Sequence, residues 1–139
     1  MSGRYRPPHD SRRYLDWMER AHADLQTARL LMKHGGDSPL AVFHAHQTCE
    51  KCFKAFLLFA ARQHADGHNL TYLCRQALRL DGGFSMYLPD CAKMSRFYIE
   101  TRYPTDLPVV ITEETAKGAL KVAEKLYRYV NAAVTTEIT

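Results

Sequence analysis

Four polar side chains along one short stretch of the sequence could do chemistry together. His46, Gln47, Glu50 and Lys54 are close enough in sequence to share one helix. At about 100° of turn per residue, Gln47, Glu50 and Lys54 occupy one flank of that helix, and His46 borders its apolar stripe. An imidazole, an amide, a carboxylate and an ammonium along one edge can bind a polar ligand or line a partner interface.

A plainer interpretation of Glu50 and Lys54 competes with this one. The two residues have the i,i+4 spacing of an exposed ion pair along a helix, which contributes roughly 0.3–0.5 kcal/mol of stability. The pattern alone favours the exposed ion pair and leaves the binding interpretation open.

A second candidate lies further along the chain, at Arg102 and Tyr103. Pro104 follows them and ends the preceding helix, because proline has no amide hydrogen to donate. Arg102 offers a planar fork of donors that suits a phosphate or a carboxylate. Alternatively, Arg102 bonds the last carbonyls of the helix and fixes the loop. If this turn approaches Glu50 across a helical bundle, the two form a polar pocket.

The cysteines are a possible metal or redox motif, because the segment 49–52 contains a Cys-x-x-Cys pair with His44 and His46 close by. A structural zinc needs four ligands, however, and His44 points away from the cysteines on a helix. A redox pair of this spacing begins a helix after a strand, whereas this pair falls in mid-helix. We therefore expect reduced core residues and no metal site. The chain has four cysteines, all in helical patterns: Cys49, Cys52, Cys74 and Cys91.

The elements that must position these residues are all predicted to be helices, since apolar residues recur at spacings of three and four. The first expected helix is capped by Asp10 or Ser11 and stops at Gly35, and the second is capped by Ser38 and runs from Pro39 to about Gln63. A short third helix is expected from Leu70 to Leu80. Pro89 opens a fourth helix, and Thr112 caps the last one. We expect an all-α fold, an up-and-down antiparallel bundle of about five helices. Residues 12–134 are predicted to form this single domain, after a flexible basic tail of residues 1–11.

Composition narrows the classes of function. The net charge of +4 is too mild to demand a nucleic-acid partner. The first residues are polar and proline-containing, unlike a secretion signal. The longest strongly apolar run, Ala55 to Ala61, is too short to span a bilayer. The expectation is a cytoplasmic protein with no membrane contact.

Four groups of residues occur in a characteristic order. They are Ala23-Asp24-Leu25 with Ala28, then Phe43-His44-Ala45-His46-Gln47 with Glu50-Lys51 and Lys54-Ala55, then His68-Asn69-Leu70, and last Arg102-Tyr103-Pro104. Together they resemble the HEPN family, the higher-eukaryote and prokaryote nucleotide-binding domain, over roughly Leu15 to Val130. The resemblance implies a bundle with a four-helix core that is commonly a homodimer.

The resemblance also implies partners. Many prokaryotic members act with a minimal nucleotidyltransferase encoded nearby, often as a toxin–antitoxin pair, and the family name reflects a proposed nucleotide-binding role. We therefore expect a module that binds a nucleotide such as ATP or AMP, or a nucleotidyltransferase, and requires no cofactor. In some toxin pairs the partner adds AMP to a tyrosine near the active-site arginine, which makes Tyr103 the candidate. The expected binding residues are His46, Gln47, Glu50, Lys54, Arg102 and Tyr103.

The sequence departs from the ribonuclease branch of the family, whose site is an arginine followed a few residues later by a histidine near the last helix. No histidine follows His68 here, and the chemistry needs an imidazole or equivalent to activate the ribose 2′-hydroxyl. Arg62 and His68 have the spacing, but they straddle the end of the second helix, where His68-Asn69 is most simply a turn and a cap. The prediction is a non-catalytic domain with RNA the less expected partner. The alternative is a ribonuclease toxin that uses Arg62 with His68, or Arg102 with Tyr103.

Overall fold

The computed structural model describes residues 10–102 and 110–135, with the side chains of residues 98–102 left out. These residues form α-helices and one 3-10 helix, and they include no strand. The all-α fold predicted from the sequence is confirmed. The elements in chain order are α1 (Tyr14–Lys33), α2 (Ser38–Ala61), α3 (Leu70–Leu78), η1 (Gly82–Tyr87), α4 (Leu88–Arg102) and α5 (Glu113–Thr135).

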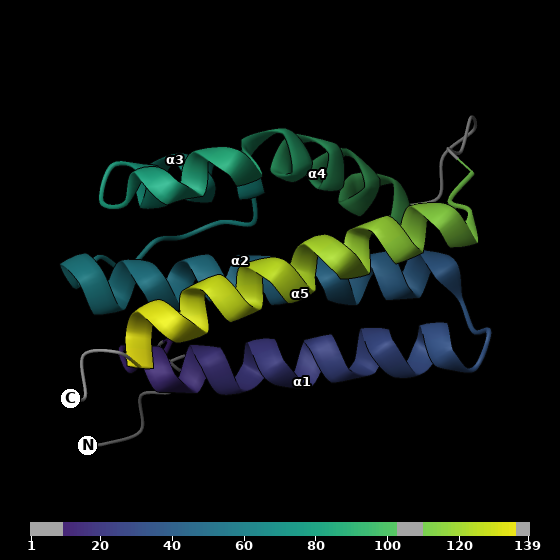
Figure 1. Ribbon diagram of the computed structural model, residues 1–139, viewed down its shortest axis with the longest axis horizontal. Coiled ribbons are helices and arrows are strands. Elements are labelled where there is room, and N and C mark those ends of the chain that lie inside the picture. Colours follow the sequence, from purple (N-terminus) through teal and green to yellow (C-terminus); the bar gives the residue numbers. More distant parts are fainter. Residues whose placement is uncertain (1–9, 103–109, 136–139) are drawn as a thin grey trace, which may run out of the picture.

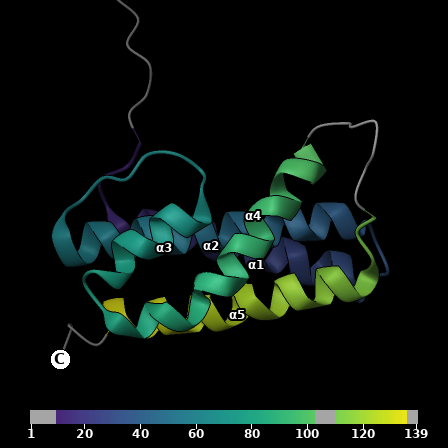
Figure 2. The same ribbon diagram turned by 90° about the horizontal axis from the view of Figure 1, so that it is seen from above.

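The four long helices alternate in direction, and α2 lies between the others (Figure 1). Helix α1 packs along one side of α2 and also contacts α5, while α4 and the shorter α3 cover another side of α2 (Figures 1 and 2). The first turn of α1 and the last turn of α2 lie at the same end of the bundle. Several polar side chains in the middle of α2, Glu50 and Lys54 among them, are buried in this arrangement.

The core is built around α2 because that helix is apolar on most of its surface. Phe53 and Leu57 are fully buried, and Phe84 of η1 packs its ring 4.7 Å from that of Phe56. η1 replaces the open turn that the glycines at 82 and 83 suggest, and Asp81 accepts the backbone N–H of Gly83 at 2.9 Å. The segment between α3 and α4 thus contributes to the core.

Two predicted helix starts are wrong by one to three residues. The N-cap of α1 is Arg13 rather than Asp10 or Ser11, because the Ser11 hydroxyl donates to the carboxylate of Asp16 at 2.7 Å. The N-cap of α2 is Asp37 rather than Ser38, since its carboxylate accepts the backbone N–H of Leu40 at 3.0 Å.

The other helix boundaries follow local chemistry closely. Helix α2 ends at Ala61, before the predicted Gln63, because Arg62 adopts a left-handed backbone with φ of 51°. Asn69 caps α3 by accepting the backbone N–H of Tyr72, and Thr112 accepts the backbone N–H of Thr115, so both of these predicted caps are confirmed. Within the described residues, no helix is both long enough and apolar enough to cross a membrane.

Candidate functional site

Glu50 and Lys54 form a buried ion pair in the middle of α2. Their side chains are 4% and 8% exposed, and Lys54 Nζ lies 3.1 Å from Glu50 Oε2. The interpretation of this pair as an exposed surface pair is wrong, because the neighbouring helix and the segment after α2 cover it. Trp17 of α1 places its ring centroid 5.4 Å from Lys54 Nζ, a distance at which a cation and an aromatic face attract one another.

His68 closes the other side of the carboxylate. It lies just before α3, and its Nδ1 is 3.0 Å from both oxygens of Glu50. The imidazole therefore reaches a residue of α2, eighteen positions earlier in the chain, beyond the turn and cap that the sequence suggests for this segment. The His68 side chain is 59% exposed, whereas the carboxylate beneath it is buried. His46 is fully buried, and its Nδ1 lies 3.9 Å from Glu50 Oε1.

We call His46, Glu50, Lys54 and His68 the Glu50 cluster. One carboxylate in it faces one ammonium and two imidazoles. Burying such charges costs several kcal/mol of desolvation for each ion, and a buried ion pair seldom repays that cost as stability. A carboxylate that holds an imidazole in place at the surface can present that ring to a polar partner. The arrangement thus places a buried ion pair beneath a largely exposed imidazole.

The remaining predicted site residues lie partly beyond what the structure describes. Gln47 is half-buried on α2. Arg102 is the last residue of α4, and its side chain is outside the described part of the chain. Tyr103 lies outside the described residues altogether. A pocket shared by Glu50 and Arg102 therefore stays a prediction.

A second charged group, which we call the Asp24 cluster, joins α1 to α2. Asp24 of α1 is bonded by His44 Nδ1 at 2.9 Å and, through its other oxygen, by the ammonium of Lys51. All three side chains are partly exposed, at 13%, 23% and 22%. The two donors come from one face of α2, so this cluster ties the two helices together.

Both clusters draw on the segments that suggested the family. A family model described as the HEPN domain matches residues 14–133 of the chain. The chain belongs to the HEPN domain family.

Solved structures agree with this membership. The crystal structure of TT1696 from Thermus thermophilus matches with a TM-score of 0.73 and 27% identity, over 88% of this chain and 98% of that one. ST0689, described as an archaeal HEPN homologue, has the same fold, with a TM-score of 0.71 and 24% identity over the same shares of the two chains. A search of curated proteins found no significant match.

In this HEPN domain, Arg62 and His68 are directed to different places. Arg62 lines a hollow of about 730 Å³, which we call the end hollow, where the last turn of α2 meets the start of α1. His68 instead contacts Glu50, which lies twelve residues before Arg62, or roughly 18 Å along the helix axis. The described lining of the end hollow consists of Arg12, Tyr14, Leu58, Phe59, Arg62 and His64.

The cysteines belong to the core of the HEPN bundle. All four are reduced and buried. Burial raises the pKa of the Cys49 and Cys52 thiols, which keeps them protonated. A hydrogen bond with Cys74, and then burial, raises the pKa of Cys91, while the same hydrogen bond lowers that of Cys74. Protonated, buried thiols are poor nucleophiles and poor metal ligands.

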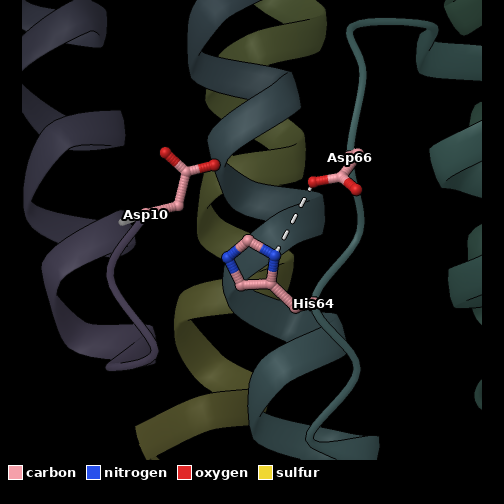
Figure 3. Close-up of side chains that lie close together, drawn as sticks. All are labelled: Asp10, His64 and Asp66. Atoms are coloured by element: carbon pink, nitrogen blue, oxygen red, sulfur yellow. Dashed lines mark ion pairs between the residues drawn. The ribbon is translucent and has the colours of Figure 1, made fainter. Parts of the chain in front are cut away.

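One group of side chains in the described residues has metal-ligand chemistry. Ligand atoms of Asp10, His64 and Asp66 all lie within 4.8 Å of one another, with His64 Nδ1 3.8 Å from Asp66 Oδ1. Figure 3 shows the His64 ring between the two aspartates. All three side chains are exposed, and exposed acidic groups commonly carry no ion. Sequence spacing gave no sign of this group, because it joins the start of α1 to the segment after α2.

Proposed function

We propose that this HEPN domain is a non-catalytic binding module that docks a partner nucleotidyltransferase through the Glu50 cluster. The observation that carries the proposal is the contrast within the cluster. Glu50 and Lys54 are buried, and His68 above them is 59% exposed. A partner that covers His68 would remove the rest of the cluster from water. Side chains that become fully desolvated at the centre of an interface dominate the affinity of many complexes.

Membership of the HEPN family supports the type of partner. The sequence segments that form the cluster are among those that resemble the HEPN family, in which many prokaryotic members act with a minimal nucleotidyltransferase. A nucleotide carried by such a partner, such as ATP or AMP, would meet the exposed His68 at the docked surface, which unites the two expected ligands in one site. Gln47 lies on the same helix and is half-buried. Arg102 and Tyr103 are proposed members of the same surface.

Ribonuclease activity is the weaker candidate. His68 is positioned by a carboxylate, as a general base often is. The arginine that should stabilise the developing charge is Arg62, however, and it lines the end hollow instead. We therefore expect labelled RNA to remain intact with the purified protein in chelator. Cleavage that His68→Ala abolishes would establish the enzyme instead.

The docking proposal is tested by examining the locus for a neighbouring nucleotidyltransferase reading frame and co-expressing it with this protein, followed by co-purification and titration calorimetry. We expect a stable complex, and we expect His68→Ala to raise its Kd about tenfold or more, the effect of an interface residue worth about 1.4 kcal/mol. His34→Ala is the matched control, because His34 is an exposed histidine at the far end of α1. A locus without such a reading frame, or a complex that tolerates His68→Ala, contradicts the proposal.

A further inference from the structure

The imidazole and the two carboxylates at the end of the bundle form a group that the proposed docking does not use. Asp10 precedes α1, whereas His64 and Asp66 follow α2, and the side chains of the three converge (Figure 3). Their ligand atoms all lie within 4.8 Å of one another. We call these three residues the His64 group. It shares no residue with the Glu50 cluster.

The members of the His64 group approach one another without bonding. His64 Nδ1 lies 3.8 Å from Asp66 Oδ1, which is beyond hydrogen-bond distance. Among the side chains that the structure describes, neither Asp10 nor Asp66 pairs with a lysine or an arginine. Two carboxylates at this separation repel one another. A cation shared by all three groups would remove that repulsion.

The segment after α2 directs two of these side chains to one side of the chain. His64 and Asp66 are exposed, and Ala65 between them is buried at 8% exposure in the core. Side chains that alternate outward, inward and outward are typical of extended chain, in which positions i and i+2 share a face. The buried Ala65 therefore anchors the backbone between the two ligands.

The third side chain stands beside an equally fixed residue. Ser11 follows Asp10, and its carbonyl accepts the indole N–H of Trp17 at 2.8 Å. The Ser11 hydroxyl also donates to Asp16 at 2.7 Å. Trp17 packs against the core, so the start of α1 is tied to the bundle next to the Asp10 carboxylate. Ligands on a backbone that is already positioned lose little freedom when they bind.

The donor set selects the kind of ion. Carboxylate oxygens alone suit Mg²⁺ or Ca²⁺, whereas an imidazole between them suits zinc and its transition-metal neighbours. Tetrahedral zinc with bonds of about 2.0–2.1 Å requires ligand atoms about 3.3 Å apart. From separations of at most 4.8 Å, the ligand atoms have to close by no more than about 1.5 Å. Exposed side chains can make such an adjustment by rotation.

We propose that the His64 group binds a zinc ion, with Asp10, His64 and Asp66 as the three protein ligands and water in the fourth position. Because one ligand precedes α1 and the other two follow α2, the ion joins two parts of the chain that are distant in sequence. An ion that binds only the folded chain stabilises it. This site and the docking surface have no residue in common, so either proposal can fail without the other.

The test is a calorimetric titration of the metal-free full chain with ZnCl₂ and, separately, with MgCl₂. We expect one zinc ion to bind per chain and Mg²⁺ to bind at least tenfold more weakly, because Mg²⁺ prefers oxygen ligands. In ¹⁵N-labelled protein, zinc should move the amide resonances of Ser11, Ala65 and Asp66 and leave those of Glu50 and Lys54 in place. Zinc should also raise the Tm of the parent.

Two variants and one control assign the ion to the His64 group. His64→Ala and Asp10→Asn each remove one exposed ligand, so both variants should fold like the parent. Each should bind zinc at least tenfold more weakly, because changes even to residues behind a metal ligand cost about 10- to 100-fold in affinity. His34→Ala removes an exposed histidine at the far end of α1 and should leave the Kd for zinc unchanged.

Asp10→Asn should also reduce the rise in Tm that zinc causes, since it removes the ligand that precedes α1. The proposal is overturned if zinc does not bind, or if either ligand variant binds zinc as tightly as the parent. It is also overturned if Mg²⁺ binds as tightly as zinc, or if His34→Ala weakens zinc binding as much as His64→Ala does.

Discussion

Two charged clusters of similar composition use α2 in different ways. Each has one carboxylate, one lysine and a histidine bonded to the carboxylate, and the Glu50 cluster contains the buried His46 as well. The Asp24 cluster joins two helices, whereas the Glu50 cluster joins α2 to the segment before α3. The side chains of the Asp24 cluster are all partly exposed, at 13–23%. The Glu50 cluster divides sharply, into a buried ion pair and an imidazole that is 59% exposed.

The difference teaches that composition does not fix the role of a charged cluster. Partly exposed charges between two helices keep more of their hydration than fully buried ones and can stabilise the contact directly. Fully buried charges lose most of their hydration, so their net contribution to stability is small or negative. We interpret the Asp24 cluster as a clamp between α1 and α2, and the Glu50 cluster as a recognition site. The effect of a substitution in one cluster on stability or binding can therefore be compared with that of the matching substitution in the other cluster.

The largest effect is expected from removing one partner of the buried pair. Glu50→Ala leaves the Lys54 ammonium buried without its counter-charge, so we expect a loss of about 3–5 kcal/mol in the free energy of unfolding. Asp24→Ala leaves Lys51 and His44 able to reach water, and should cost about 1–3 kcal/mol. Urea unfolding measures both losses. Equal losses would remove the distinction between the clusters.

A double substitution should restore much of that loss. Glu50→Leu with Lys54→Met replaces the ion pair by apolar side chains of similar volume, and such replacements are often neutral or stabilising. We expect the double variant to be within about 1 kcal/mol of the parent, so that the two changes are strongly coupled. Urea unfolding of Glu50→Leu, of Lys54→Met and of the double variant completes the double-mutant cycle. A double variant as unstable as Glu50→Ala would mean that the fold requires the charges.

The two histidines should differ in their effect on stability. His44→Ala removes a hydrogen bond between helices and should cost about 1–2 kcal/mol. His68→Ala removes a largely exposed ring and should cost less than about 1 kcal/mol. Thermal unfolding at constant pH compares the two variants directly. A larger loss for His68→Ala would assign it a mainly structural role.

Raising the salt concentration should produce the smallest difference between the two clusters, in the coupling energies of their ion pairs. Raising the ionic strength from 0.1 M to 1 M shortens the screening length from about 10 Å to about 3 Å, and screening acts mainly on charges near water. The coupling of Asp24 with Lys51 should therefore fall by a few tenths of a kcal/mol, while that of Glu50 with Lys54 should change less. Double-mutant cycles at the two salt concentrations provide the comparison.

The sequence predicts well those features that depend on near neighbours. The spacing of apolar residues predicts the helices, and Asn69 and Thr112 are recognisable caps because each bonds an amide three residues away. The cap at Ser11 fails, because the hydroxyl is already bonded to Asp16. The types of the residues alone do not show whether a hydroxyl will bond a nearby side chain or cap the helix.

The site is less predictable because it depends on contacts between distant segments. Glu50 and Lys54 have the spacing of a surface pair, yet the pair is buried, with Trp17 against Lys54 and His68 against Glu50. Both of those contacts come from other elements, α1 and the segment before α3. The end hollow is a further case, since Arg12 and Arg62 line one space only because α1 begins beside the end of α2.

The most direct test compares the two histidines in binding rather than in stability. Titration calorimetry of the co-expressed nucleotidyltransferase against the parent, His68→Ala and His44→Ala separates recognition from clamping. We expect His68→Ala to weaken the complex at least tenfold, and His44→Ala to lower stability and leave the Kd unchanged. A complex that is weakened by His44→Ala and indifferent to His68→Ala would contradict it.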